Sequence, residues 1–298
     1  MSTVSLVRLI ALSAIWGASF LFMRIGAPVL GPVWLAELRV GLAAVFLLVV
    51  GVVLGKRLQL REHARHYLVL GGLNSALPFV LFGAAAQTLP ASLLSILNAT
   101  APIWAAVVGA AWTGTPLSRR ALFGLALGLA GVALLVGIDA AMLRGGTFAA
   151  IAMALGASLS YGVATNYARA AKKIEPFANA HGSMWAATLM LLPAVPFAPV
   201  PAMPGTSVAL AVLALGIVCS GVAYLLYFRL IEDIGAAQAL TVTFLVPVFG
   251  VIWGHVVLAE PIEWHMLAGA CVVIVGTALL TGFSPMALFA RKAQPAKG

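Results

Sequence analysis

Ten apolar stretches, each about twenty residues long, alternate with short polar segments along the chain. They cover residues 7–25, 33–54, 67–87, 91–112, 120–138, 148–169, 178–198, 207–229, 236–257 and 264–283. An α-helix needs about 20 apolar residues to cross the hydrocarbon core of a bilayer. Because lipid offers the backbone no hydrogen bonds, such a segment must make them internally, as a helix does. The pattern therefore predicts an all-α integral membrane protein with ten transmembrane helices.

Composition agrees with this fold class and narrows the function. Hydrophobic residues make up 63% of the chain and charged residues 8%, whereas a soluble domain carries roughly 25% charged residues. The net charge of +9 does not indicate nucleic-acid binding, because the basic residues lie in short loops between the apolar stretches. A membrane enzyme would need a nucleophile and base or a carboxylate cluster in the bilayer, and the middles of the stretches contain no acid and no histidine. We therefore expect neither catalysis nor a cofactor nor a bound metal.

The second half of the chain repeats the sequence pattern of the first half. Ala91–Pro116 reads ASLLSILNATAPIWAAVVGAAWTGTP, and Ala236–Pro261, 145 positions later, reads AAQALTVTFLVPVFGVIWGHVVLAEP. The same register continues upstream and downstream, and a repeat at a fixed period predicts a repeated architecture. The expected parts are a first five-helix repeat, residues 1–140, a second five-helix repeat, residues 146–285, and a polar cytoplasmic tail, residues 286–298.

The distribution of Lys and Arg predicts the orientation. With a cytoplasmic N-terminus, the cytoplasmic side holds Arg8, Lys56, Arg57, Arg61, Arg65, Arg119, Arg120, Arg169, Lys172, Lys173, Arg229, Arg291, Lys292 and Lys297. The other side holds only Arg24 and Arg144, so the positive-inside rule places both termini in the cytoplasm, in a cell inner (plasma) membrane. Because each repeat has five helices, an odd number, the second must enter from the opposite face. Two inverted five-helix repeats are the architecture of secondary transporters with a central site.

Several stretches resemble a known family. The stretches IWGASFLFMRIG, ELRVGLAAVFLL, ASLLSILNATAPIWAAVVGA and RRALFGLALGLAGVALL are similar to the first, second, fourth and fifth helices of one repeat of the EamA family, in the drug/metabolite transporter superfamily. The resemblance covers nearly the whole chain, twice. It implies a ten-helix metabolite exporter, and several such exporters carry amino acids, including aromatic ones. Family members often have Gly-Glu after the fourth helix of a repeat. Here the second half has Ala259-Glu260 and the first has Gly114-Thr115.

Polar and aromatic residues that recur on one helix face in both halves are the candidates for a central cavity, since they would face the axis between the repeats. In the first half they are Trp16, Ser75, Phe79, Phe82 and Asn98, and in the second half Tyr161, Ser220, Tyr224, Tyr227 and Thr243. The alternative interpretation is that the aromatic side chains anchor the protein in lipid and that the serines only pack helices together.

Five further assignments concern single residues. Asn98 either caps a helix distortion or binds substrate. Pro102 and Pro247 cannot donate a backbone hydrogen bond, so each kinks its helix, as a static bend or as a gating hinge. Arg39 lies within the second stretch, and we expect it to form a structural ion pair rather than to bind substrate. For Glu37, near the start of that stretch, we expect a side chain that reaches interfacial water.

The expected cavity is aromatic and polar but uncharged, which suits a zwitterionic amino acid with an apolar or aromatic side chain. The absence of a mid-membrane carboxylate predicts facilitated export and poor export of permanent cations. The alternative is a multidrug transporter or a transporter of other metabolites, of the sugar or nucleotide-sugar type. The expected partners are a small-molecule substrate and the lipid bilayer, with no nucleic acid, and a monomer is compatible with the sequence.

Overall fold

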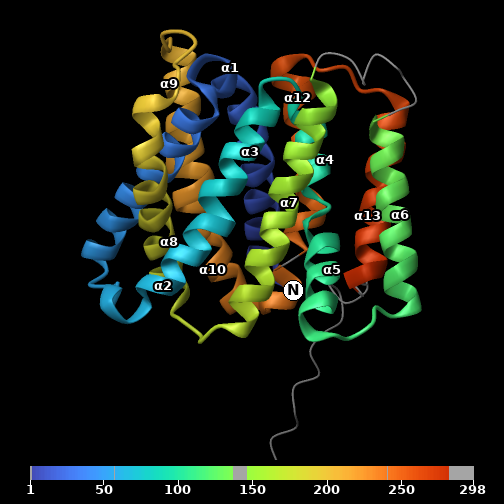
Figure 1. Ribbon diagram of the computed structural model, residues 1–298, viewed down its shortest axis with the longest axis horizontal. Coiled ribbons are helices and arrows are strands. Elements are labelled where there is room, and N and C mark those ends of the chain that lie inside the picture. The colour runs from blue at the N-terminus through green and yellow to red at the C-terminus, as the bar shows by residue number, and fades with distance from the viewer. Residues whose placement is uncertain (1, 57, 137–145, 240, 282–298) are drawn as a thin grey trace, which may run out of the picture.

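A computed structural model describes residues 2–56, 58–136, 146–239 and 241–281. The expected tail, residues 286–298, lies outside this part of the chain. The described residues form an all-helical bundle (Figure 1). Its elements are α1 (Thr3–Val53), α2 (Leu60–Gly71), η1 (Gly72–Ala76), α3 (Leu77–Ala86), α4 (Ala91–Asn98), α5 (Ala101–Thr113), α6 (Arg119–Val136), α7 (Thr147–Ala170), α8 (Pro176–Leu191), η2 (Leu192–Phe197), α9 (Thr206–Leu213), η3 (Ala214–Val222), α10 (Ala223–Ile234), α11 (Ala236–Ala239), α12 (Val242–Leu258) and α13 (Trp264–Thr281).

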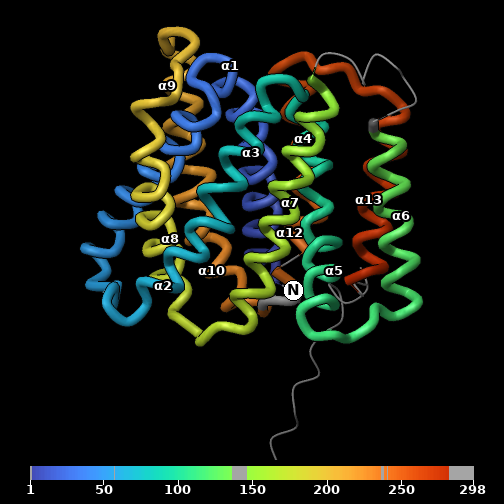
Figure 2. Tube along the Cα trace, in the orientation of Figure 1, coloured from blue at the N-terminus to red at the C-terminus, as the bar shows by residue number. Residues whose placement is uncertain are grey.

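Helix α1 is a hairpin of two antiparallel helices. Its 51 residues would extend about 75 Å if straight, more than twice the hydrocarbon thickness. The chain reverses at Gly31, whose φ of 74° and ψ of 165° suit a residue without a Cβ. Pro32 then begins the second half, where the missing N–H costs nothing. Figure 2 shows the reversal in blue, at the end of the bundle opposite the N-terminus.

Two long helices each contain a π-helical turn at matching places in the two halves. The helix Leu60–Ala86 contains η1, and the helix Thr206–Ile234 contains η3. The two π-helical turns hold Ser75 and Ser220, which are 145 positions apart. Such turns insert a residue into the helix and rotate the side chains that follow, and they are frequent at functional sites.

The fourth stretch, which the sequence predicts to be kinked, is distorted over Ala99 and Thr100, whose φ and ψ stay in the right-handed helical region. Helix α4 ends at Asn98, and α5 begins at Ala101, so that Pro102 lies in the first turn of a new helix. A proline is tolerated there, because the N–H groups of the first turn have no intrahelical partner. In the second half, Pro247 lies inside α12.

Glycines pair the two halves reciprocally. A Cβ at Gly17 would lie 2.7 Å from Phe249, and a Cβ at Gly162 would lie 2.9 Å from Trp104, the counterpart of Phe249. The α6–α13 contact follows the same rule. A Cβ at Gly124 would meet the Gly276 backbone, and one at Gly131 would meet the Gly269 backbone. Because Gly269 is the counterpart of Gly124 and Gly276 is the counterpart of Gly131, each glycine touches the counterpart of the other. Small residues at these positions let the backbones approach closely.

The core consists of two hydrophobic clusters. One includes Phe20 and Phe82, and the other includes Phe79 and Met184. Tyr161 of α7 packs against both clusters, so it marks the place where they meet. This junction lies inside the bundle and positions the candidate site.

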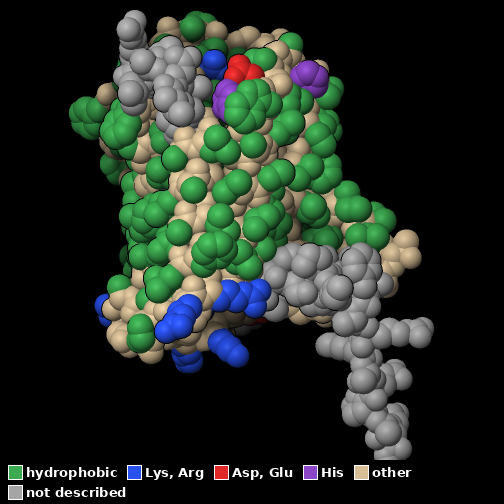
Figure 3. Space-filling model, turned by 90° about the vertical axis from the view of Figure 1, so that its right-hand side faces the viewer, with side chains coloured by type: hydrophobic (Ala, Val, Ile, Leu, Met, Phe, Trp, Pro, Cys, Tyr) green, Lys and Arg blue, Asp and Glu red, His purple; other side chains and the backbone are tan. Residues whose placement is uncertain are grey.

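The surface is apolar over its height and basic at one end. Hydrophobic side chains cover the middle of the face in Figure 3, and most of the basic side chains on that face gather at its lower edge. Helix α6 begins at that end with Arg119 and Arg120. Among the described residues, six helices are long and apolar enough to cross a membrane, and they are Thr3–Val53, Leu60–Ala86, Ala91–Thr113, Thr147–Ala170, Thr206–Ile234 and Trp264–Thr281. The chain is thus an all-helical membrane protein, and the number of ten helices stays a prediction.

Candidate functional site

Arg39 lies inside the bundle, in a region where the sequence analysis expected no charge. It is eight residues beyond the Gly31 turn, which places it about 12 Å down the helix, and it is only 7% exposed. Its Nε–H donates to Ser220 Oγ over 2.9 Å, and one Nη donates to Met23 Sδ over 3.5 Å. The guanidinium carbon lies 3.6 Å from the centroid of the Phe79 ring, in cation–π geometry.

The expected ion pair of Arg39 is therefore wrong for the part of the chain that the structure describes, in which no carboxylate lies within salt-bridge distance of the guanidinium. Glu37 is two positions away, and residues at that spacing point to different sides of a helix. Glu37 also does not reach water as expected. It is 8% exposed, and its Oε2 has no hydrogen-bond partner among the described residues.

Aromatic rings surround this position and come from both halves of the chain. Trp16 of α1 contacts Tyr227 of α10, with 5.3 Å between the ring centroids. Phe82 of α3 stacks on Tyr161 of α7, with centroids 6.2 Å apart. Tyr161 and Tyr224 pack against the hydrophobic cluster that contains Phe79, the ring beside the guanidinium. The cluster thus joins helices that are distant in sequence.

The two π-helical turns contribute polar groups to the same region. Ser220 Oγ accepts from Arg39 and donates to the Leu215 carbonyl, 3.1 Å away. Its counterpart Ser75 is fully buried, and its Oγ has no hydrogen-bond partner among the described residues. Asn74, beside Ser75, donates to the Tyr224 hydroxyl over 3.4 Å. The two serines therefore occupy equivalent places, but among the described residues only Ser220 has hydrogen-bond partners.

The break between α4 and α5 exposes backbone carbonyls that other helices satisfy. The Leu97 carbonyl accepts from Thr100 Oγ1 over 2.6 Å and from Ser158 Oγ over 3.1 Å. The Ala99 carbonyl accepts from Thr277 Oγ1 of α13. Asn98 does not cap the distortion, and its half-buried side chain makes no hydrogen bond to another described residue.

The structure places most of the predicted site residues in three groups of contacts. Trp16 meets Tyr227, Phe82 meets Tyr161, and Arg39 links Phe79 with Ser220. The first group also reaches Tyr224 through Phe228, which stacks on Tyr224 and contacts Tyr227.

The other three predicted site residues are placed differently. Ser75, Asn98 and Thr243 are buried or half-buried, and no contact joins Ser75 or Asn98 to the rings. Ser75 and Asn98 thus keep their places in the repeat without taking part in the ring contacts of the described residues.

Three residues outside the main set of predicted site residues take part in the cluster; the first was only a weaker candidate in the sequence, and the other two were missed. They are Asn74, Met23 and Phe228, which contact Tyr224, Arg39 and Tyr227 respectively. Their counterparts in the other half are Cys219, Ala168 and Gly83. None of the three pairs shares a polar or aromatic character, so a search for recurring residues passes over them.

Polar contacts hold the two ends of the bundle. At the end near the Gly31 turn, Glu260, after α12, accepts from the Ala91 N–H over 2.7 Å and from the Ser92 hydroxyl over 2.6 Å. This carboxylate caps α4, whose N-terminal N–H groups favour a negative charge. At the opposite end, Arg8 of α1 pairs with Asp233 of α10. Each contact joins one half of the chain to the other.

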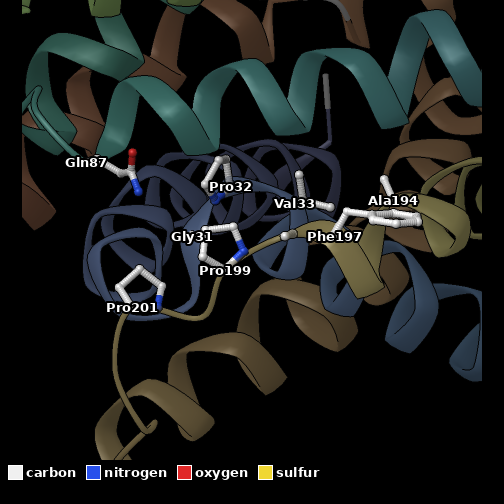
Figure 4. A pocket seen from close by; sticks show the side chains of 9 residues that line it. Gly31, Pro32, Val33, Gln87, Ala194, Phe197, Pro199 and Pro201 are labelled. Atoms are coloured by element: carbon white, nitrogen blue, oxygen red, sulfur yellow. The ribbon is translucent and has the colours of Figure 1, made fainter.

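A cavity of about 520 Å³ lies at the end of the bundle, apart from the aromatic cluster. Figure 4 shows its wall, where Gly31 and Pro32 of α1 face Phe197 and Pro199, with Gln87 at one side. The wall contains none of the predicted site residues and no charged side chain. We place the candidate site at Arg39 and the rings, because the polar groups converge there.

Comparison with known proteins gives one consistent result. Residues 4–137 and 148–282 each match the EamA-like transporter family. The chain is 24% identical over 272 residues to the uncharacterized transporter YoaV of Bacillus subtilis (strain 168), an alignment that covers 90% of this chain and 93% of that protein. It is 24% identical over 275 residues to the uncharacterized transporter YvbV of the same organism, covering 89% of this chain and 87% of that protein.

A solved crystal structure of a protein has the same fold. It matches with a TM-score of 0.64 and 21% identity, over 96% of this chain and 99% of that one. The two family matches together cover most of the chain, and they account for the 145-residue register and for the reciprocal glycine contacts. The chain therefore belongs to the EamA-like transporter family, and it is a membrane transporter and not an enzyme.

Proposed function

We propose that this transporter exports small neutral metabolites, foremost amino acids with apolar or aromatic side chains. The observation that carries the proposal is the ring cluster, in which Trp16 meets Tyr227 and Phe82 meets Tyr161. Aromatic faces bind apolar and aromatic side chains by stacking and burial. The hydroxyl of Tyr224 and the amide of Asn74 belong to the same region and offer hydrogen bonds to a polar head group.

The proposed architecture is ten transmembrane helices in two inverted repeats, residues 1–140 and 146–285. The reciprocal contacts of Gly124 with Gly276 and of Gly131 with Gly269 support it, because a two-fold axis generates such pairs. In Figure 1, α7 also runs opposite to the first half of α1, its counterpart.

The proposed orientation in a cell inner membrane has both termini in the cytoplasm, in keeping with the basic end of the bundle. Cysteine labelling tests it. Lys173→Cys should react from the cytoplasmic side and Gly205→Cys from the outside. Labelling of Gly205→Cys only from the cytoplasm would contradict the orientation.

Transport would proceed by alternating access between the repeats. The Glu260 cap and the Arg8–Asp233 pair lie at opposite ends and join opposite halves, so each would break when its end opens. The helix break before Pro102 and the proline inside α12 are the proposed hinges. A proline interrupts the ladder of helical hydrogen bonds, so a helix can bend there with little further loss.

The ring cluster favours amino acids over the alternative substrates. A permanent cation would meet the Arg39 guanidinium and no carboxylate partner among the described residues of the cluster. A phosphate monoester carries almost two negative charges at neutral pH, and the cluster offers one buried cation.

The deciding experiment is counterflow in proteoliposomes. Phenylalanine, tryptophan, threonine and methionine are compared with glucose phosphate and ethidium, with and without imposed pH and sodium gradients. We expect flux of the amino acids and none of ethidium. Flux of glucose phosphate or ethidium without amino-acid flux would refute the proposed substrate class. The pH gradient matters because Glu37 carries a buried carboxyl group.

A further inference from the structure

Arg39 is a buried cation without a carboxylate partner in the part of the chain that the structure describes. Seven of the eight Asp and Glu residues are described, and the eighth, Asp139, is not. A charge held in a membrane interior is costly unless a partner compensates it. Glu37, the one described acid within the same half of α1, does not reach the guanidinium. The other six are engaged elsewhere: Glu62, Glu175, Glu232, Asp233 and Glu263 in ion pairs, and Glu260 in the α4 cap.

The protein satisfies only part of the hydrogen-bonding capacity of this guanidinium. Arginine carries five N–H donors. Here Nε–H binds Ser220 Oγ, and one Nη binds the weak acceptor Met23 Sδ. The Phe79 ring covers one face of the group, and no described residue accepts a hydrogen bond from its second Nη. A guanidinium edge matches the two oxygens of a carboxylate.

The second half of the chain does not repeat this charge. The counterpart of Arg39 is Met184, and the counterpart of Ser220 is Ser75, whose buried Oγ has no partner among the described residues. A residue that only packed helices together would be expected at the equivalent position of both halves. The single arginine instead gives the cluster one positive pole among rings that come from both halves.

We infer that Arg39 binds the carboxylate of the transported molecule. The inference rests on the proposed function and deepens it, because it makes the carboxylate the required group of the substrate. The aromatic rings then receive the side chain, and Ser75 Oγ and the Asn74–Tyr224 pair are the nearby polar groups for the remainder of the head group. Molecules with an ammonium group but no carboxylate are predicted to bind poorly.

The test compares three ligands that differ in charge. They are phenylalanine, phenylalaninamide, which lacks the carboxylate, and 3-phenylpropionate, which lacks the ammonium group. Each competes against labelled phenylalanine in counterflow with the purified full-length protein. We expect phenylpropionate to compete, and we expect the amide to compete about 10- to 100-fold more weakly than phenylalanine, the range of a charge-assisted hydrogen bond.

Variants of Arg39 separate binding from structure. Arg39→Gln should weaken the binding of phenylalanine about 10- to 100-fold and leave the binding of the amide unchanged. Arg39→Lys should restore part of the preference for phenylalanine over the amide. Arg24→Gln is the matched control, since Arg24 also belongs to α1 and donates to the Ala86 and Gln87 carbonyls. It should not change the ratio between the ligands.

The outcomes distinguish the inference from the proposed function. Equal competition by phenylalanine and its amide in the unmodified protein overturns the role of Arg39 and leaves amino-acid transport intact. So does an Arg39→Gln variant that loses both ligands in equal proportion. The ligand comparison needs no variant, so it decides the matter even if Arg39→Gln does not fold. Absence of any amino-acid flux overturns the proposed function and this inference with it.

Discussion

Ala259 holds a backbone conformation that suits glycine, and replacing it should stabilise the protein. Its φ is 54° and its ψ 31°, at the C-terminal cap of α12. The counterpart Gly114, at the cap of α5, has a φ of 67° and a ψ of 11°. A Cβ at Gly114 would meet nothing within 4 Å. Comparing variants at these two caps therefore isolates the energetic cost of the left-handed backbone conformation.

The magnitude follows from two opposing terms. The left-handed conformation costs a residue with a Cβ roughly 1–2 kcal/mol, and glycine gives back about 0.4–1 kcal/mol through the greater freedom of the unfolded chain. We expect Ala259→Gly to stabilise the protein by about 0.5–1 kcal/mol, which raises Tm by about 1–3 °C in a chain of this size. Gly114→Ala should lower Tm by a similar amount.

The assay is thermal unfolding in one detergent, followed by tryptophan fluorescence. The scan rate is held constant, because Tm depends on the rate wherever unfolding is irreversible. Opposite shifts for the two variants are the expected result. A lower Tm for Ala259→Gly, or no shift for either variant, would show that the conformation at these caps stores no strain.

Three other variants test the fold and the site. Glu260→Ala removes the α4 cap and should lower the free energy of unfolding by about 1–2 kcal/mol. Glu263→Ala, in the same loop and paired with His265, should lower it little. Equal losses of stability in the two variants would refute the capping role. Trp16→Ala should reduce transport with surface expression preserved, and Trp16→Phe should retain more activity; unchanged transport in Trp16→Ala would exclude this ring from the site. Gly276→Val places a side chain against the α6 backbone and should destabilise the protein by about 1–3 kcal/mol, so a yield of folded protein equal to the wild type would contradict the close α6–α13 contact.

The helical class and the repeat were predictable from the sequence, and the contacts between the halves explain the register. The apolar runs are long enough to require helices, since lipid leaves the backbone no other partner. The glycine register was equally informative: Gly17 and Gly162 recur because both sit where another helix backbone approaches closely. Recurring rings such as Trp16 and Tyr161 also lie inward, half-buried and in contact with other rings.

Other features depend on local geometry that a hydrophobic pattern does not encode. The π-helical turns at η1 and η3 leave the apolar pattern unchanged, although they rotate the helix face that carries Ser75 and Ser220. In the sequence, the distortion after Asn98 is visible only as a proline. The hydroxyls of Ser158 and Thr277, which donate to backbone carbonyls there, come from other helices. Such partners are known only once the helices are packed.

A search for residues that recur in both halves finds packing residues and does not find Arg39. Averaging over the two halves selects residues that recur, and Arg39 does not, since its counterpart is Met184. The same holds for Glu260, whose counterpart is Thr115. Motion between two inverted repeats needs equivalent helices, so packing residues recur. A substrate with one carboxylate needs one cation, and a second buried arginine in the other half would add a desolvation cost with no group to compensate it. The residue that binds the carboxylate is therefore expected to break the repeat, whereas the rings proposed to receive the side chain stand at positions that recur in both halves.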